Sequence, residues 1–233
     1  MRRIATVWLT IAASLTLASC ESVLMERPLS DEKTSVFDER LLGEWIPATE
    51  DNRDEQDTFF FGRNEVAAKT LDLIWVAKRH ERVSSLPLQT YVTVAKKRYI
   101  SFVYRGKEDN SQLAKLAIAY KYEMPDDETL WLWPINRDFI NSAIQRRELH
   151  GIVETGGEAK GTAIFDEKTG KWTRVPVVAL RPWERPEGTN IVLMDAPSTI
   201  LAFLERNDEA CFHDAAIQVY TRVPRLSVLR PRH

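Results

Sequence analysis

Histidine is scarce in this chain, and the spacings that build metal or nucleotide sites are absent. The four histidines are His80, His150, His213 and His233. None stands at metal-ligand spacing from another histidine or from a cysteine. The sequence also lacks a Gly-x-Ser-x-Gly nucleophile elbow and a Walker loop, and the glycines at 156–161 have the wrong spacing for a dinucleotide loop. We therefore expect no metal, no cofactor and no catalytic residue supplied by a local motif.

A large excess of charge of either sign is also missing. Lys and Arg number 32 and Asp and Glu number 34, which gives a formal net charge of −2. A nucleic-acid-binding protein would show a basic face, so no nucleic acid is expected as a partner. The apolar fraction of 44% and the charged fraction of 28% are ordinary for a folded globular domain long enough to bury a core.

Long apolar runs are absent except at the start of the chain. Residues 4–17 are mostly apolar and follow Arg2 and Arg3. As a helix they would reach about 21 Å, which is less than the ~30 Å hydrocarbon core of a bilayer. The pattern predicts a cleaved export signal at residues 1–19. A permanent transmembrane helix is the alternative.

The residues that close this run are Leu17-Ala18-Ser19-Cys20, and they resemble the lipobox of bacterial lipoproteins. The resemblance implies that Cys20 is acylated, for example with palmitate, and becomes the first residue of the mature chain. Two or more acyl chains hold a protein firmly to a membrane. Glu21 stands where an aspartate usually retains such proteins at the inner membrane of Gram-negative cells, so the resemblance implies the outer membrane, facing the periplasm. An ordinary cleaved signal, with Cys20 as a bystander, is the alternative.

Cysteine is nearly absent from the rest of the chain. If Cys20 is acylated, Cys211 is the one cysteine left, and no intramolecular disulfide can form. Stability must then come from a hydrophobic core. The neighbours Ala210 and Phe212 predict that Cys211 is a small buried hydrophobe. An intermolecular disulfide or a nucleophilic role for this thiol remains open.

The mature chain is expected to contain a flexible tether at 20–36, a single β-rich domain at 37–223 and a basic tail at 224–233. The tether prediction rests on many charges and no periodicity. Alternating apolar residues predict strands at 43–46, 58–61, 71–76, 90–94, 99–104, 116–123, 129–133, 152–154, 162–165, 171–180, 190–194 and 217–223. Helical spacing predicts helices at 136–149 and 198–207.

This order of elements predicts a mainly β fold with two helices (α+β), in which an antiparallel sheet forms a β-barrel or is strongly curved. Residues 96–98 are expected to link two strands as a hairpin. In the strand at 116–123, the large apolar residues take the even positions, while Ala, Lys and Glu take the odd ones. That pattern predicts one buried face and one face in water.

The run from Asp38 to Trp45 resembles the start of small uncharacterised bacterial lipoproteins, a family with no settled activity. The segments at 139–151 and 201–223 also follow that family's pattern. Gly43-x-Trp45 is similar to the Gly-x-Trp opening of lipocalins. That likeness implies a lipocalin-like barrel in which Trp45 packs across the closed base of eight strands. The alternative is that Trp45 is simply a core aromatic residue at the start of a strand.

The function expected from these patterns is a non-catalytic binding or interaction module. Aromatic pairs on single strand faces, Tyr120 with Tyr122 and Trp131 with Trp133, line either a packed core or a pocket for a small apolar ligand. The other expected partner is a protein of the envelope. An envelope hydrolase that uses dispersed carboxylates is the alternative. The acidic residues at 126–128 and 208–209 are expected to lie at turns in contact with water. A third option places the basic tail against anionic headgroups or glycan.

Overall fold

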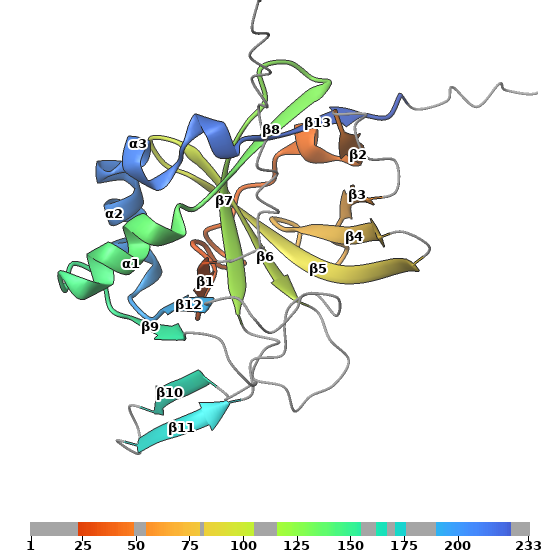
Figure 1. Ribbon diagram of the computed structural model, residues 1–233. Helices are drawn as coiled ribbons and strands as arrows, with labels where there is room; N and C mark the ends of the chain where they lie inside the picture. The colour runs from red at the N-terminus through yellow and green to blue at the C-terminus, as the bar shows by residue number, and fades with distance from the viewer. Residues whose placement is uncertain are drawn as a thin grey trace, which may run out of the picture.

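The computed structural model describes residues 23–48, 55–79, 82–104, 116–154, 162–166, 171–175 and 190–224. Eight of its strands are β2 (Gly43–Pro47), β3 (Glu55–Arg63), β4 (Leu71–Arg79), β5 (Arg82–Val94), β6 (Arg98–Tyr104), β7 (Ala117–Glu123), β8 (Thr129–Pro134) and β13 (Gln218–Arg222). They pair antiparallel in the order β6-β5-β4-β3-β2-β13-β8-β7, and β7 pairs with β6 to close the ring (Figure 1). The predicted mainly β fold with an antiparallel barrel is confirmed.

Seven of the barrel strands, β2 to β8, follow one another along the chain as neighbours in the sheet. The eighth, β13, comes from the C-terminal region and fills the gap between β8 and β2. The predicted hairpin after β5 is present, because β6 begins at Arg98 and the amide of Ala95 donates to the carbonyl of Lys97 over 3.0 Å. Two strands exceed their predictions, since β3 extends beyond 58–61 and β5 begins at Arg82 rather than residue 90. Serines and Pro87 dilute the strand pattern there, and pairing with β4 overrides it.

Three further strands extend the sheet beyond the barrel: β1 (Val23–Met25), β12 (Asn190–Leu193) and β9 (Gly151–Glu154). Strand β1 pairs with Ala117 and Ile118 of β7, on the same edge where β8 pairs further along. Strand β12 is parallel to β1 and antiparallel to β9. Gly151 allows a close approach here, because a Cβ at this residue would lie 2.9 Å from the carbonyl oxygen of Val192.

The prediction of a flexible tether at 20–36 is wrong for its described residues. Val23, Leu24 and Met25 are buried and hydrogen-bonded in the sheet on both sides. Further on, Leu29 is buried, and the amide of Val92 donates to the hydroxyl of Ser35 over 2.9 Å. Three apolar residues suffice to form a strand once two partner strands are supplied, and the charged residues that follow concealed this strand in the sequence pattern.

Helices cover one side of the barrel from outside. They are α1 (Arg137–Gln145), α2 (Pro197–Arg206) and the short α3 (Asp208–Cys211) (Figure 1). Both predicted long helices are therefore present, although α1 ends four residues before residue 149. Asn136 caps α1 by accepting hydrogen bonds from the amides of Asp138 and Phe139, and Pro197 opens α2 at a position that suits proline. In the part of the chain that the structure describes, no helix is long and apolar enough to cross a membrane.

These helices create a second hydrophobic cluster outside the barrel. Its members come from β1, β6, β7, β12 and the helices, and include Met25, Tyr99, Ile140, Ile191 and Phe203. The predicted water-facing side of residues 116–123 is consequently wrong, because Ala117, Ala119 and Lys121 are all buried. Small side chains at the odd positions allow the cluster to pack closely against β7.

A separate two-stranded antiparallel sheet consists of β10 (Thr162–Asp166) and β11 (Lys171–Val175). The predicted strand at 162–165 is confirmed, and the one predicted at 171–180 is confirmed as far as residue 175. Two short 3-10 turns complete the described elements: η1 (Glu39–Leu41) before β2 and η3 (Asp214–Ala216) before β13.

Candidate functional site

Among the side chains that the structure describes, those that line the lumen of the barrel are almost entirely apolar and aromatic. Alternate residues of the strands point inward, as expected for a small closed barrel. The inward aromatic residues are Trp45, Phe59, Phe61, Trp75, Phe102, Tyr120, Tyr122 and Tyr220, and all of them are buried. A ligand carried by the barrel would have to lie among these side chains.

Aromatic rings meet across this lumen. The Phe59 ring centroid lies 6.1 Å from that of Phe102, although two strands, β4 and β5, separate β3 from β6 in the sheet. Phe59 also contacts Tyr220 at 4.8 Å, and Phe102 contacts Tyr120 at 5.6 Å. Such tilted ring pairs are typical of packed aromatic cores. At the level of Phe59 the lumen is filled by side chains, which supports the core interpretation of Tyr120 and Tyr122.

One end of the barrel is closed by η1 and by Trp45. The Trp45 side chain is fully buried, and its Nε1 donates to the carbonyl of Leu41 over 2.8 Å. The guanidinium of Arg222 stacks 4.6 Å from the centre of the indole ring and donates to the carbonyls of Leu42 and Arg40. Trp45 is thus a buried core residue at the start of a strand, as the alternative interpretation of Gly43-x-Trp45 predicted, and it lies against η1. The last barrel strand and the turn before the first one are fastened together here.

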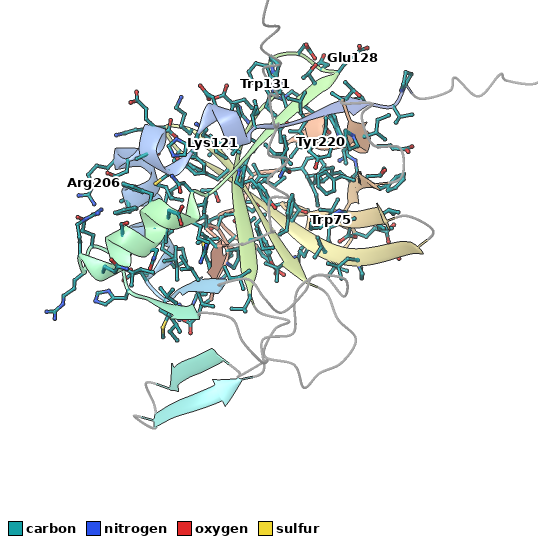
Figure 2. All side chains as sticks on the ribbon, in the orientation of Figure 1. Trp75, Lys121, Glu128, Trp131, Arg206 and Tyr220 are labelled. Atoms are coloured by element: carbon teal, nitrogen blue, oxygen red, sulfur yellow. The ribbon has the colours of Figure 1, made fainter. Side chains whose placement is uncertain are left out.

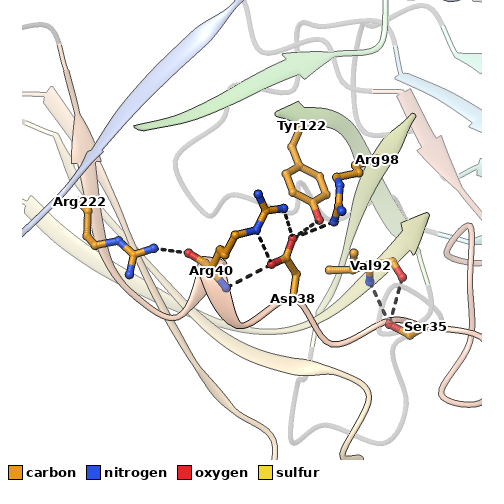
Figure 3. Close-up of polar contacts among 7 residues, drawn as sticks. All are labelled: Ser35, Asp38, Arg40, Val92, Arg98, Tyr122 and Arg222. Atoms are coloured by element: carbon orange, nitrogen blue, oxygen red, sulfur yellow. Dashed lines mark hydrogen bonds and ion pairs between the residues drawn. The ribbon is translucent and has the colours of Figure 1, made fainter. Parts of the chain in front are cut away.

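Asp38 forms a second set of polar contacts at the same end of the barrel (Figure 3). Its carboxylate is 6% exposed and accepts hydrogen bonds from three side chains. These are Arg40, through Nη2 at 2.8 Å, Arg98 of β6, through Nη1 at 3.0 Å, and the Tyr122 hydroxyl of β7 at 3.0 Å. The contacts tie η1 to the strands that close the barrel.

The electrostatics of this cluster fit a carboxylate that is charged at neutral pH. Burial alone would raise the pKa of Asp38, but the hydrogen bonds from Arg40 and Tyr122 outweigh it, and the net effect lowers the pKa. Burial and the neighbouring Asp38 charge raise the pKa of Tyr122. Asp38 therefore stays ionised and Tyr122 stays protonated at neutral pH, which suits a structural lock rather than proton transfer.

Outside the barrel, a lysine is buried under the helices (Figure 2). Lys121 of β7 is 7% exposed. Its Nζ lies 3.3 Å from both carboxylate oxygens of Asp208, 4.9 Å from the centre of the Trp133 ring and 5.0 Å from that of Phe212. One carboxylate and two aromatic faces thus replace the water that the ammonium loses. This arrangement joins α3 to the barrel.

Cys211 lies beside this lysine cluster, fully buried in α3. Burial, with the nearby Asp208 charge, raises the pKa of the thiol to about 12. A thiol that stays protonated is a poor nucleophile. The prediction of a small buried hydrophobe is confirmed for Cys211.

Two of the four histidines lie among the described residues, and both occupy structural positions. His150 lies 2.9 Å from Asp195 through Nδ1, and its backbone amide donates to the same carboxylate over 2.6 Å. His213 contacts the side-chain amide of Asn136 at 2.6 Å. His80 and His233 lie outside the described residues. Among the residues that are described, no group of three or more His, Cys, Asp or Glu could hold a metal ion.

Two carboxylates from the acidic segments at 126–128 and 208–209 also have structural partners. Asp126 accepts the amide of Glu128 over 2.9 Å and so closes the turn before β8, while Asp208 pairs with Lys121. The acylation site Cys20, the whole predicted signal, the glycines at 156–161 and the tail after Pro224 lie outside the described residues, and the predictions for them stay predictions.

Side chains on the outer surface of β2 to β5 form an apolar patch, which we call the outer wall. It consists of Ile46 of β2, Phe60 of β3, Ile74 of β4 and Pro87 of β5. All four are exposed, with 37% of Phe60 and 49% of Ile74 accessible to solvent. Phe60 pairs across the strands with Ile74, and Ile74 with Pro87, so these three side chains form a row. The described helices pack elsewhere on the barrel.

Comparison with known proteins gives no match: no family model, no curated protein and no solved structure resembles the chain at a significant level.

Neither the outer wall nor the buried polar residues that stabilise the fold were predicted from the sequence. Asp38 stands just before a turn, where aspartate is a common capping residue, so the sequence carried a local signal for its structural role. Lys121 also carried one, since a charged residue in an otherwise apolar strand requires a partner when it is buried. The outer wall had no signal, because an exposed strand residue cannot be told from a buried one until the neighbouring elements are placed.

Proposed function

We propose that this protein is a non-catalytic interaction module of the bacterial envelope. It is held at the outer membrane, facing the periplasm, by acyl chains on Cys20. The lipobox pattern Leu17-Ala18-Ser19-Cys20 supports the anchor. The contact between Phe59 and Phe102 across the lumen is the observation that carries the rest, because it favours a solid scaffold over a ligand carrier.

Because side chains fill the lumen at the level of Phe59, we place the interaction site on the outer surface of the barrel. The outer wall is apolar and exposed on an otherwise well-packed domain, and such patches mark interaction sites more often than single scattered apolar residues do. Its occupant in this proposal is an envelope protein that presents a complementary apolar surface. Glu44, which pairs with Phe60 at the edge of the wall, favours a partner with a basic residue at the corresponding position.

The hydrolase alternative receives no support from the described carboxylates. Asp38 is surrounded by two arginines and a tyrosine, Asp195 is paired with His150, and Asp208 is paired with Lys121. These pairings favour a module that binds over one that catalyses.

The test is site-specific photo-cross-linking in living cells with the full-length chain. A photoreactive residue at Phe60 is compared with one at Asp138 on α1, which is 93% exposed and lies off the wall. We expect one discrete protein adduct from position 60 that disappears in the Cys20→Ala variant, and none from position 138. Absence of an adduct at position 60, or the same adducts at position 138, would contradict the proposal.

A further inference from the structure

The shortness of the connection between the predicted anchor and the folded domain has consequences for how the protein sits on the membrane. Strand β1 begins at Val23, three residues after Cys20. Three residues span at most about 11 Å even when fully extended. If Cys20 carries the acyl chains, which is part of the proposed function, the lipid surface must come within roughly that distance of Val23.

Val23 is itself a fixed point of the fold. It pairs with Ile191 of β12, and the next residue, Leu24, pairs with both Val192 and Ile118. Val23 and Met25 pack in the cluster beneath the helices, and Leu24 packs with the residues that fill the barrel. Strand β1 therefore cannot lengthen the connection without losing two sets of strand hydrogen bonds and three buried side chains.

We infer that the flank formed by β1, β12 and β9 rests against the lipid headgroups, so that the domain has one preferred orientation on the membrane. The opposite side of the barrel then points away from the bilayer. In the ring of eight strands, β7, which carries β1, lies four places from β3 in either direction. Figure 1 shows β1, β12 and β9 on one side of the barrel and β2, β3 and β4 on the other.

The described residues of this flank suit a membrane surface. Ile152 and Val153 of the edge strand β9 are partly exposed. The exposed Arg147 precedes that strand after α1, next to Arg146, which is paired with Glu148. Arginine heads beside apolar side chains match the boundary between phosphate groups and acyl chains. The outer wall, with Phe60 and Ile74, is left free to meet a partner in the periplasm.

The inference is tested with the full-length acylated protein in phospholipid nanodiscs that contain a gadolinium-labelled headgroup lipid. Paramagnetic relaxation is measured at isoleucine methyl groups. Those of Ile152 and Ile191 report on the flank, and those of Ile46 and Ile74 report on the outer wall. We expect relaxation at the flank methyls to exceed that at the wall methyls several-fold.

A matched variant carries a 16-residue Gly/Ser insertion between Ser22 and Val23, which adds a flexible coil of about 22 Å on average. In this variant we expect the difference between the flank and the wall to fall markedly. Equal relaxation of all four methyls in the unmodified chain, or stronger relaxation at the wall, would overturn the inference.

The mass of the N-terminal peptide separates the two proposals. An acylated Cys20 with equal relaxation at all four methyl groups contradicts the fixed orientation alone. A bare thiol at Cys20 contradicts the anchor, and with it both the proposed function and the orientation.

Discussion

Single polar residues decide how the closed end of the barrel is built. Asp38 joins η1 to β6 and β7 through its contacts with Arg98 and Tyr122, and Arg222 joins β13 to the same turn. The apolar pattern predicted Trp45 as a core residue at the start of a strand. It could not predict the cluster, because the partners of Asp38 are up to 84 residues away in the chain.

We expect Asp38→Ala to lower the free energy of unfolding by about 2 kcal/mol, because the hydrogen bonds from Arg40, Arg98 and Tyr122 to a charged acceptor are lost while the two arginines can regain water. Tyr122→Phe removes one of these bonds and should cost about 1 kcal/mol. Urea unfolding measures both. Glu39→Ala is the control, since its ion pair with Arg63 is exposed. Asp38→Ala as stable as this control would contradict the assigned role.

The same carboxylate predicts how stability depends on pH. The pKa of Asp38 in the fold is below its ordinary value of 3.8, so the unfolded chain takes up a proton more readily. The stabilising effect is therefore complete above the unfolded pKa and is lost as the pH falls through the folded one. Urea unfolding between pH 7 and about pH 3 should show a steeper loss below about pH 4 in the natural chain than in Asp38→Asn. Equal slopes would show that Asp38 titrates alike in both states.

The buried pair of Lys121 and Asp208 predicts an asymmetry between its two partners. Asp208→Ala leaves a buried ammonium with only ring faces around it, and should cost about 3 kcal/mol. Lys121→Met removes the charge and keeps the shape, so stability should change by less than about 1 kcal/mol. Thermal and urea unfolding of both variants measure the difference. Equal losses would mean that the ammonium regains water when Asp208 is removed.

At the scale of elements, local patterns were sufficient where burial affects one face of a strand or helix. The strand at 129–133 and the helix at 198–207 were predicted close to their observed bounds. Patterns failed where a neighbouring element changes the environment. Helices cover the outer face of β7, β4 supports the serine-rich half of β5, and β7 and β12 turn Val23–Met25 into a strand.

A substitution in β1 tests directly whether Val23–Met25 is a packed strand or part of a flexible tether. Met25 is 0% exposed in the cluster beneath the helices, so Met25→Ala should lower the free energy of unfolding by about 3 kcal/mol. Glu26→Ala, one residue later and outside that cluster, should change it by less than about 0.5 kcal/mol. Urea unfolding of the two variants is the measurement. Equal stability of the two variants would instead support a flexible tether at these residues.

At the scale of the whole molecule, the fold is a closed barrel with its helices gathered on one side (Figure 1). The exposed apolar residues of the outer wall lie on β2 to β5, away from these helices. The barrel and its two helices followed from the order and spacing of the strands. The sequence pattern did not indicate which strands lie on which side of the barrel. That arrangement is seen only in the topology, because β1 and β13 join the sheet from the two ends of the domain. The anchor at Cys20 and the partner of the wall remain proposals.

The most direct test of this account is native mass spectrometry of the full-length protein extracted gently from membranes. The account predicts a chain that begins at Cys20 and carries covalent acyl groups, with no additional small molecule retained in the barrel. A chain that begins at Met1, an unmodified Cys20, or an apolar ligand bound in a one-to-one ratio would contradict it.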